Sequence, residues 1–108
     1  MKHGLKQKYI DHINSVLATY PSIEKVLLYG SRAKGTHYNG SDIDLTFFGK
    51  GIELSLLMKV ENELDDLLLP YKIDASIFDD IENQDLKEHI NRVGVVFYEK
   101  KKCSKESI

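Results

Sequence analysis

The sequence predicts a single α/β (α+β) domain in which helices cover one face of a small mixed β-sheet of three to five strands. Segments with the apolar period of amphipathic helices alternate with short segments in which polar and apolar residues alternate, as in half-buried strands. The length of 108 residues fits one domain, residues 1–108, and 42% apolar with 30% charged residues is ordinary for a globular chain.

Three segments are expected to form helices. Residues 5–20 and 53–69 each carry an apolar stripe and are each followed by a proline, which stops a helix. A shorter helix begins with a cap at Asn83 or Asp85 and ends at Gly94. The apolar residues that recur at helical spacing are Leu5, Tyr9, Ile13, Val16, Leu17 and Tyr20, then Leu57, Val60, Leu64, Leu67 and Leu68, then Leu86, His89, Ile90 and Val93.

Four short segments are expected to form strands, and they cover residues 25–29, 42–48, 71–78 and 95–98. The alternation is clearest in the second and third of them, where every other residue is apolar. Because side chains of a strand alternate between its two faces, each of these strands has one face for a core and one polar face.

Composition argues against several classes of function. The formal net charge of −2 argues against a general nucleic-acid binder, which would carry a basic face. The single cysteine, Cys103, excludes an internal disulfide framework, and the four histidines are scattered without zinc spacing. No signal-peptide pattern or membrane-length apolar run is present, so the cytoplasm is the expected location. The charged tail, residues 100–108, is expected to fray beyond a core of about residues 5–99.

The chemistry is expected in residues 27–48, L-L-Y-G-S-R-A-K-G-T-H-Y-N-G-S-D-I-D-L-T-F-F. Asp42 and Asp44 stand two residues apart on a strand, so both side chains project from the same face. Adjacent carboxylates repel each other and are costly to desolvate unless they are paired or bind a metal. Hard oxygen ligands on a rigid strand suit Mg²⁺, which completes its shell with water and substrate phosphates.

A phosphate site is predicted at the other end of the same stretch. Gly30 and Ser31 follow a strand and open one turn of helix, and a helix N-terminus offers free backbone N–H groups to phosphate. Arg32 and Lys34 lie beside this site, as phosphate contacts or as solvated loop charges. Two further residues of this loop are candidates for substrate contact, although a polar loop tip needs no function: His37 and Tyr38.

Asp74 is the candidate third carboxylate of the site. It lies on the polar side of the strand at residues 71–78, opposite the apolar Ile73 and Ile77. If this strand is the neighbour of the strand that carries Asp42 and Asp44, the three carboxylates converge.

Gly30-Ser31, ten intervening residues and Asp42-Ile43-Asp44 match the G-S-x10-D-x-D signature of the DNA-polymerase-β-like nucleotidyltransferases. Beyond this signature, residues 5–99 resemble the minimal nucleotidyltransferases, through the K-I-D strand of Asp74 and the pattern R-x-G-x-x-x-Y at residues 92–98. The resemblance implies the polymerase β-like nucleotidyltransferase fold.

The resemblance also implies roles for individual residues. Gly30 and Ser31 would hold a nucleoside triphosphate. Asp42 and Asp44 would bind two Mg²⁺ ions, and Asp74 would complete the metal site beside the attacking hydroxyl. ATP is the donor that the family implies, and a HEPN-domain ribonuclease toxin is the implied partner. AMP would move onto a tyrosine of that toxin, which makes the chain an antitoxin with protein adenylyltransferase activity.

Two alternatives stay open. One is a binding antitoxin that blocks the HEPN partner without catalysis, which exposed apolar residues on the first helix or in the tail would favour. The other is a transferase that acts on a small molecule such as an aminoglycoside, although no second domain is seen to hold it. The sequence does not reveal the base of the nucleotide, the acceptor or the oligomeric state.

Overall fold

A computed structural model describes residues 5–35 and 42–100 of the chain. The elements in chain order are α1 (Gln7–Ala18), β1 (Lys25–Tyr29), α2 (Ser31–Lys34), β2 (Ile43–Phe48), α3 (Leu54–Asp66), β3 (Ile73–Ile77), the 3₁₀-helix η1 (Phe78–Asp80), α4 (Gln84–Val93) and β4 (Val95–Glu99). All the predicted helices and strands are present, with ends that shift by a few residues. The predicted fraying of the tail, and Cys103 in it, lie outside the described residues.

The four strands form one mixed sheet in the order β3-β2-β1-β4. β1 pairs antiparallel with both β2 and β4, whereas β2 and β3 are parallel. A parallel pair needs a crossover, and α3 supplies it between β2 and β3. The mixed sheet with its helices confirms the predicted fold class, and β2 and β3 are the neighbours that convergence of the aspartates requires.

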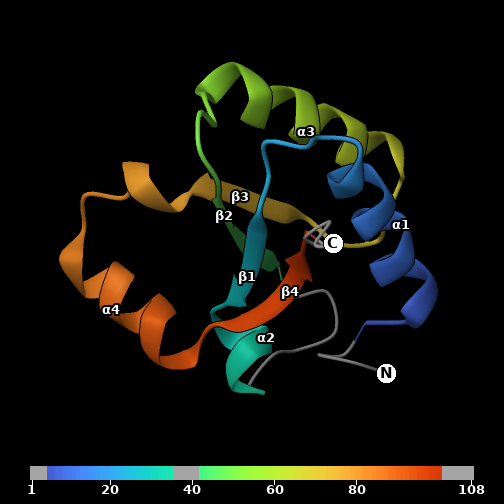
Figure 1. The fold of residues 1–108 in the computed structure, drawn as a ribbon. Helices are drawn as coiled ribbons and strands as arrows, with labels where there is room; N and C mark the ends of the chain where they lie inside the picture. The colour runs from blue at the N-terminus through green and yellow to red at the C-terminus, as the bar shows by residue number, and fades with distance from the viewer. Residues whose placement is uncertain (1–4, 36–41, 101–108) are drawn as a thin grey trace, which may run out of the picture.

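One face of the sheet carries the main apolar core. α1 and α3 contact each other, and Figure 1 shows them on one side of the molecule, apart from α4. The fully buried members of this core come from α1, the strands and α3, and include Ile13, Leu17, Val26, Leu28, Ile43, Leu45, Phe47 and Val60. In the described part of the chain, no helix has the length and apolar character needed to cross a membrane.

The end of α3 differs from the prediction at Leu68. The apolar spacing predicts Leu68 as part of the buried stripe, but this side chain is 87% exposed. α3 ends at Asp66, and Leu68 has a left-handed backbone with φ 54°. Helical periodicity no longer holds after the last turn, because α3 ends three residues before the end at residue 69 that the proline suggested.

α4 occupies a different place from α1 and α3. Ile90 is fully buried, yet it lies outside the main core cluster. The ring of His89 contacts the ring of Tyr29, which faces away from the core residue Leu28 on β1. α4 therefore covers the β1 part of the sheet face that carries the aspartates.

Gly94 ends α4 because of close packing. Glycines that end helices usually have a positive φ, whereas Gly94 is extended, with φ −64° and ψ 141°. A Cβ atom at this position would overlap the carbonyl oxygen of Ile90 and would lie 3.4 Å from Cδ1 of Leu27. Glycine is thus needed here to fit against the carbonyl oxygen of Ile90 in the last turn of α4, not for its backbone freedom.

We expect Gly94→Ala to lower the free energy of unfolding by about 1–3 kcal/mol, because the new methyl group would overlap the carbonyl oxygen of Ile90 and the end of α4 would have to shift. Urea denaturation followed by circular dichroism measures this change. A free energy of unfolding within about 0.5 kcal/mol of the wild-type value would contradict the steric conflict with the Ile90 carbonyl.

Candidate active site

The aspartates lie together on one face of neighbouring strands. Asp44 of β2 is paired in register with Asp74 of β3 and with Tyr29 of β1. Paired residues of a sheet point to the same face, so these three side chains form a row across three strands. Asp42 stands two residues before Asp44 and lies on the same side. The structure thus brings all three predicted carboxylates to one end of β2 and β3.

Within the described ranges, the negative charge of this group is not compensated. Asp44 is half-buried, whereas Asp42 and Asp74 are exposed. Burial, and after it the charges of Asp74 and Asp42, raise the pKa of Asp44. Among the described residues, no basic side chain forms an ion pair with any of the three. A bound cation would remove this repulsion.

The donor chemistry fits Mg²⁺. Within residues 5–35 and 42–100, no three His, Cys, Asp or Glu side chains gather closely enough to make a complete metal cage. Mg²⁺ does not need one, because it commonly takes one or two carboxylates and completes its shell with waters and substrate phosphates. Asp44 with one of its neighbours provides that kind of partial ligand set, with nucleotide phosphates as the remaining ligands.

Gly30 joins the carboxylates to the start of α2. Its φ is +79°, a conformation that other residues rarely adopt. A Cβ atom here would overlap Oδ2 of Asp44 and would lie 3.3 Å from its Cγ. α2 begins at the next residue, Ser31. The missing side chain therefore allows the Asp44 carboxylate to lie against the backbone at the N-terminus of α2.

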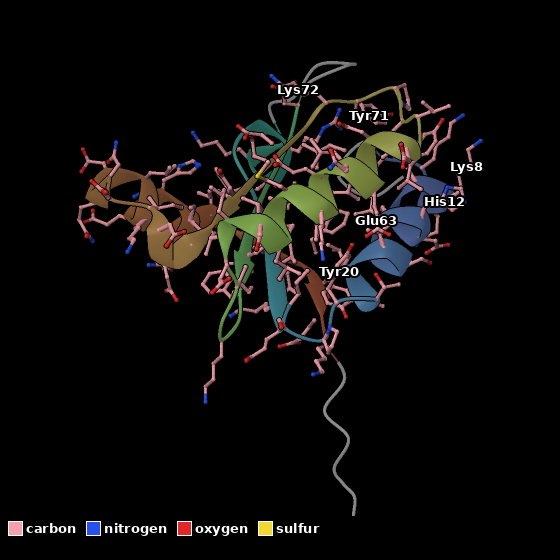
Figure 2. The ribbon with its side chains drawn as sticks, turned by 90° about the horizontal axis from the view of Figure 1, so that it is seen from above. Lys8, His12, Tyr20, Glu63, Tyr71 and Lys72 are labelled. Carbon is pink, nitrogen blue, oxygen red and sulfur yellow. The ribbon has the colours of Figure 1, made fainter. Side chains whose placement is uncertain are left out.

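The two basic residues of α2 have different surroundings. Arg32 is only 2% exposed, and its guanidinium carbon lies 4.8 Å from the ring centroid of Tyr71. Tyr71 in turn packs edge-on against Tyr9 of α1, and Figure 2 shows it where the chain leaves α3, on the α1 side. Arg32 thus connects α2 to the helical layer. Lys34 is exposed, so it is the one of the two that faces solvent.

Two residues beside the carboxylates were not singled out by the sequence: Tyr29 and Ser76. Tyr29 is 9% exposed, and its side chain is hydrogen-bonded to that of Ser76. Burial raises the pKa of Tyr29, the hydrogen bond opposes this, and the charges of Asp44 and Asp74 raise it further. Ser76 Oγ also donates to the Leu45 carbonyl oxygen at 3.4 Å. The sequence signal for Ser76 was its position two residues after Asp74.

The other predicted contacts of this region cannot be placed. His37 and Tyr38 lie outside the described residues, and so does the loop in which they stand. The phosphate roles of Gly30, Ser31, Arg32 and Lys34 and the metal roles of the three aspartates remain predictions, although the structure places these residues in one region.

The family model described as polymerase beta, nucleotidyltransferase matches residues 11–103, so the chain belongs to that family. No curated protein matches the chain.

Solved structures agree with this assignment. A chain in the crystal structure of a toxin–antitoxin with AMP-PNP has a TM-score of 0.68 and 17% identity, over 90% of this chain and 76% of that one. A chain in the tri-AMPylated Shewanella oneidensis HEPN toxin in complex with MNT antitoxin has a TM-score of 0.66 and 15% identity, over 89% and 74%. A putative nucleotidyltransferase from Sulfolobus solfataricus has a TM-score of 0.52 and 22% identity, over 86% and 78%. The polymerase β-like fold and the resemblance to minimal nucleotidyltransferases are confirmed.

Gly30→Ala is expected to weaken Mn²⁺ binding by at least about tenfold, a free-energy loss of roughly 1.4 kcal/mol, because the new methyl group displaces the Asp44 carboxylate. Gly51→Ala is the matched control. Gly51 also has a positive φ, +73°, but a Cβ there meets no atom within 4 Å. It should share the cost in backbone strain and keep the metal affinity, as measured by isothermal titration with Mn²⁺. Equal affinities in the two variants would contradict the contact.

Proposed function

We propose that this chain is a Mg²⁺-dependent nucleotidyltransferase that moves AMP from ATP onto a hydroxyl group of a partner protein. The observation that carries the proposal is the position of Asp44. Its carboxylate lies against Gly30 at the start of α2 and is paired in register with Asp74. Metal-binding carboxylates and a phosphate-binding helix start thus adjoin each other, as transfer of a nucleotide requires. Family membership supports the reaction class.

Each predicted site residue has its own role in the proposed reaction. Asp42 and Asp44 would hold Mg²⁺, which neutralises charge on the phosphates and lowers the pKa of the attacking hydroxyl. The backbone of Gly30 and Ser31 holds the phosphates, and Asp74 orients the acceptor hydroxyl for attack on the α-phosphorus. A bond forms from the acceptor oxygen to this phosphorus, the proton of the acceptor hydroxyl is lost to solvent, and the bond to the leaving pyrophosphate breaks. Catalysis here is positioning and charge stabilisation.

The partner that we propose is a HEPN-domain toxin, with a tyrosine hydroxyl as the acceptor. Similar chains occur in a toxin–antitoxin crystal with AMP-PNP and in a complex of an MNT antitoxin with a tri-AMPylated HEPN toxin. These neighbours support adenine as the base and a toxin as the acceptor. The chain would then act as an antitoxin that inactivates its partner by AMPylation.

Intact mass spectrometry of the co-expressed HEPN partner tests the proposal. With the wild-type chain we expect the partner to gain the mass of one or more AMP groups. The double substitution Asp42→Asn, Asp44→Asn should abolish the gain and leave the chain at least as stable, because it removes like charges.

The charge-matched control is Asp79→Asn, Asp80→Asn, at two exposed positions of η1, beyond the opposite end of β3. It should transfer AMP as the wild type does. A mass gain that persists with the Asp42/Asp44 variant would exclude these residues from catalysis, and the absence of any gain with the wild type would refute AMPylation.

Binding without catalysis is a second candidate, and the surface of α3 favours it. Leu54 is 65% exposed and Met58 is 55% exposed, one helical turn apart. Met58 also lines a groove of about 310 Å³ between α3 and the edge strand β3, together with Glu61, Asn62, Leu64, Asp65, Lys72 and Ile73. From the sequence, exposed apolar residues on the first helix or in the tail would favour this candidate. In the described part of the chain, α1 has none, and residues 101–108 are outside it.

If α3 holds the partner, Leu54→Gln with Met58→Gln should weaken the complex by at least about tenfold, since apolar anchors dominate such interfaces. Val96→Gln, at an apolar residue 49% exposed on β4, is the control. Affinity is measured by surface plasmon resonance with the purified partner. Unchanged affinity would remove α3 from the interface, and cell protection by the Asp42/Asp44 variant would establish binding as the antitoxin mechanism.

A further inference from the structure

The C-terminal half of α4 lies beside the row of carboxylates. His89 packs edge-on against Tyr29, with ring centroids 6.3 Å apart, and Tyr29 is paired in register with Asp44. Arg92 follows His89 by three residues, so the two side chains lie on the same side of the helix. α4 therefore brings a histidine and an arginine to the end of β1 at which the proposed reaction takes place.

Lys34 reaches the same place from α2. Its backbone N–H donates to the carbonyl oxygen of Gly30 at 3.1 Å, and Gly30 lies against the Asp44 carboxylate. Burial, and after it the positive charges of Lys34 and Arg92, lower the pKa of His89. Three basic side chains from two separate helices thus gather on one side of the carboxylates.

No acidic side chain in the part of the chain that the structure describes forms an ion pair with this basic group. Among the residues that the structure describes, neither Lys34 nor Arg92 forms a hydrogen bond or an ion pair through its side chain. Each stands in the last turn of its helix, where the helix dipole stabilises a cation by about 0.3–1 kcal/mol. The helix dipole explains why a single cation is favoured at the end of a helix. It does not explain why the ends of α2 and α4 bring two cations close to each other. A ligand with several negative charges would relieve this repulsion.

We infer that Lys34, His89 and Arg92 form a subsite for the β- and γ-phosphates of the nucleoside triphosphate. The inference rests on the proposed nucleotidyl transfer, because it states where the leaving group of that reaction binds. The α-phosphate must lie at the metal-binding carboxylates, and the rest of the polyphosphate then extends past Gly30 toward α4. The planar guanidinium of Arg92 suits bidentate contact with phosphate, and Lys34 supplies a compact charge.

The subsite also explains one feature of the R-x-G-x-x-x-Y pattern. Gly94 of this pattern is required because a side chain would overlap the Ile90 carbonyl at the end of α4, and the packing of α4 places His89 beside Tyr29. Arg92 itself is exposed and contributes no described side-chain contact to the fold. Its place in the pattern is therefore better explained by a ligand than by stability.

Binding of inorganic tripolyphosphate in the presence of Mg²⁺ tests the subsite without an acceptor and without catalysis. By isothermal titration of the full chain, we expect Arg92→Gln and Lys34→Gln each to weaken this binding by about tenfold, or roughly 1.4 kcal/mol. Lys59→Gln, at an exposed position of α3, removes the same charge and should change the affinity by less than about twofold. Binding of AMP with Mg²⁺ should be the same in all three variants.

The possible outcomes test the subsite independently of the proposed reaction. Wild-type tripolyphosphate affinity in a folded Lys34→Gln, Arg92→Gln double variant, with folding checked by thermal unfolding, would overturn the subsite. An equal loss of AMP and tripolyphosphate affinity would also overturn it, because the residues would then not act on the polyphosphate tail. Failure of the wild type to transfer AMP to its partner would refute the proposed reaction, whereas selective loss of tripolyphosphate binding would still support the subsite.

Discussion

The contact between the Asp44 carboxylate and the backbone of Gly30 is the constraint on which the site depends. Antiparallel pairing sets Tyr29 opposite Asp44, and the chain then turns at Gly30 with φ +79° into α2. Any side chain at this position would meet the carboxylate. The same glycine thus allows the left-handed turn and the close approach, and so joins the strand proposed to bind metal to the helix start proposed to bind phosphate.

Elsewhere in the site, acidic and basic side chains form two separate groups. Asp44 and Asp74 lie in register with Tyr29, and His89 packs against the ring of Tyr29 within reach of the positive charges of Lys34 and Arg92. The like charges within each group repel one another, and no described residue neutralises the charge of either group. A metal–nucleotide complex carries both kinds of charge, with the cation at one end and the polyphosphate beside it. Such a ligand would relieve both repulsions at once, which is a physical reason for a protein to keep them.

Neighbouring residues of one motif serve different purposes. Arg32 and Lys34 stand two positions apart in a four-residue helix, and both were candidates for phosphate contact. Arg32 is buried against Tyr71 and helps to join α2 to α1, whereas Lys34 is exposed beside the carboxylates. A similar division separates Gly94, which serves packing, from Arg92, which does not.

The sequence by itself determined the secondary structure and the placement of Asp42 and Asp44 on one face, because helical and strand periods are local properties of the chain. It also determined the family signature, which depends only on residue types and spacing. Tertiary structure alone decided that β3 lies parallel beside β2, so that Asp74 pairs with Asp44. It also decided that Arg32 is buried and that α4 packs over Tyr29. These features depend on the packing of segments far apart in the chain, which local sequence patterns do not encode.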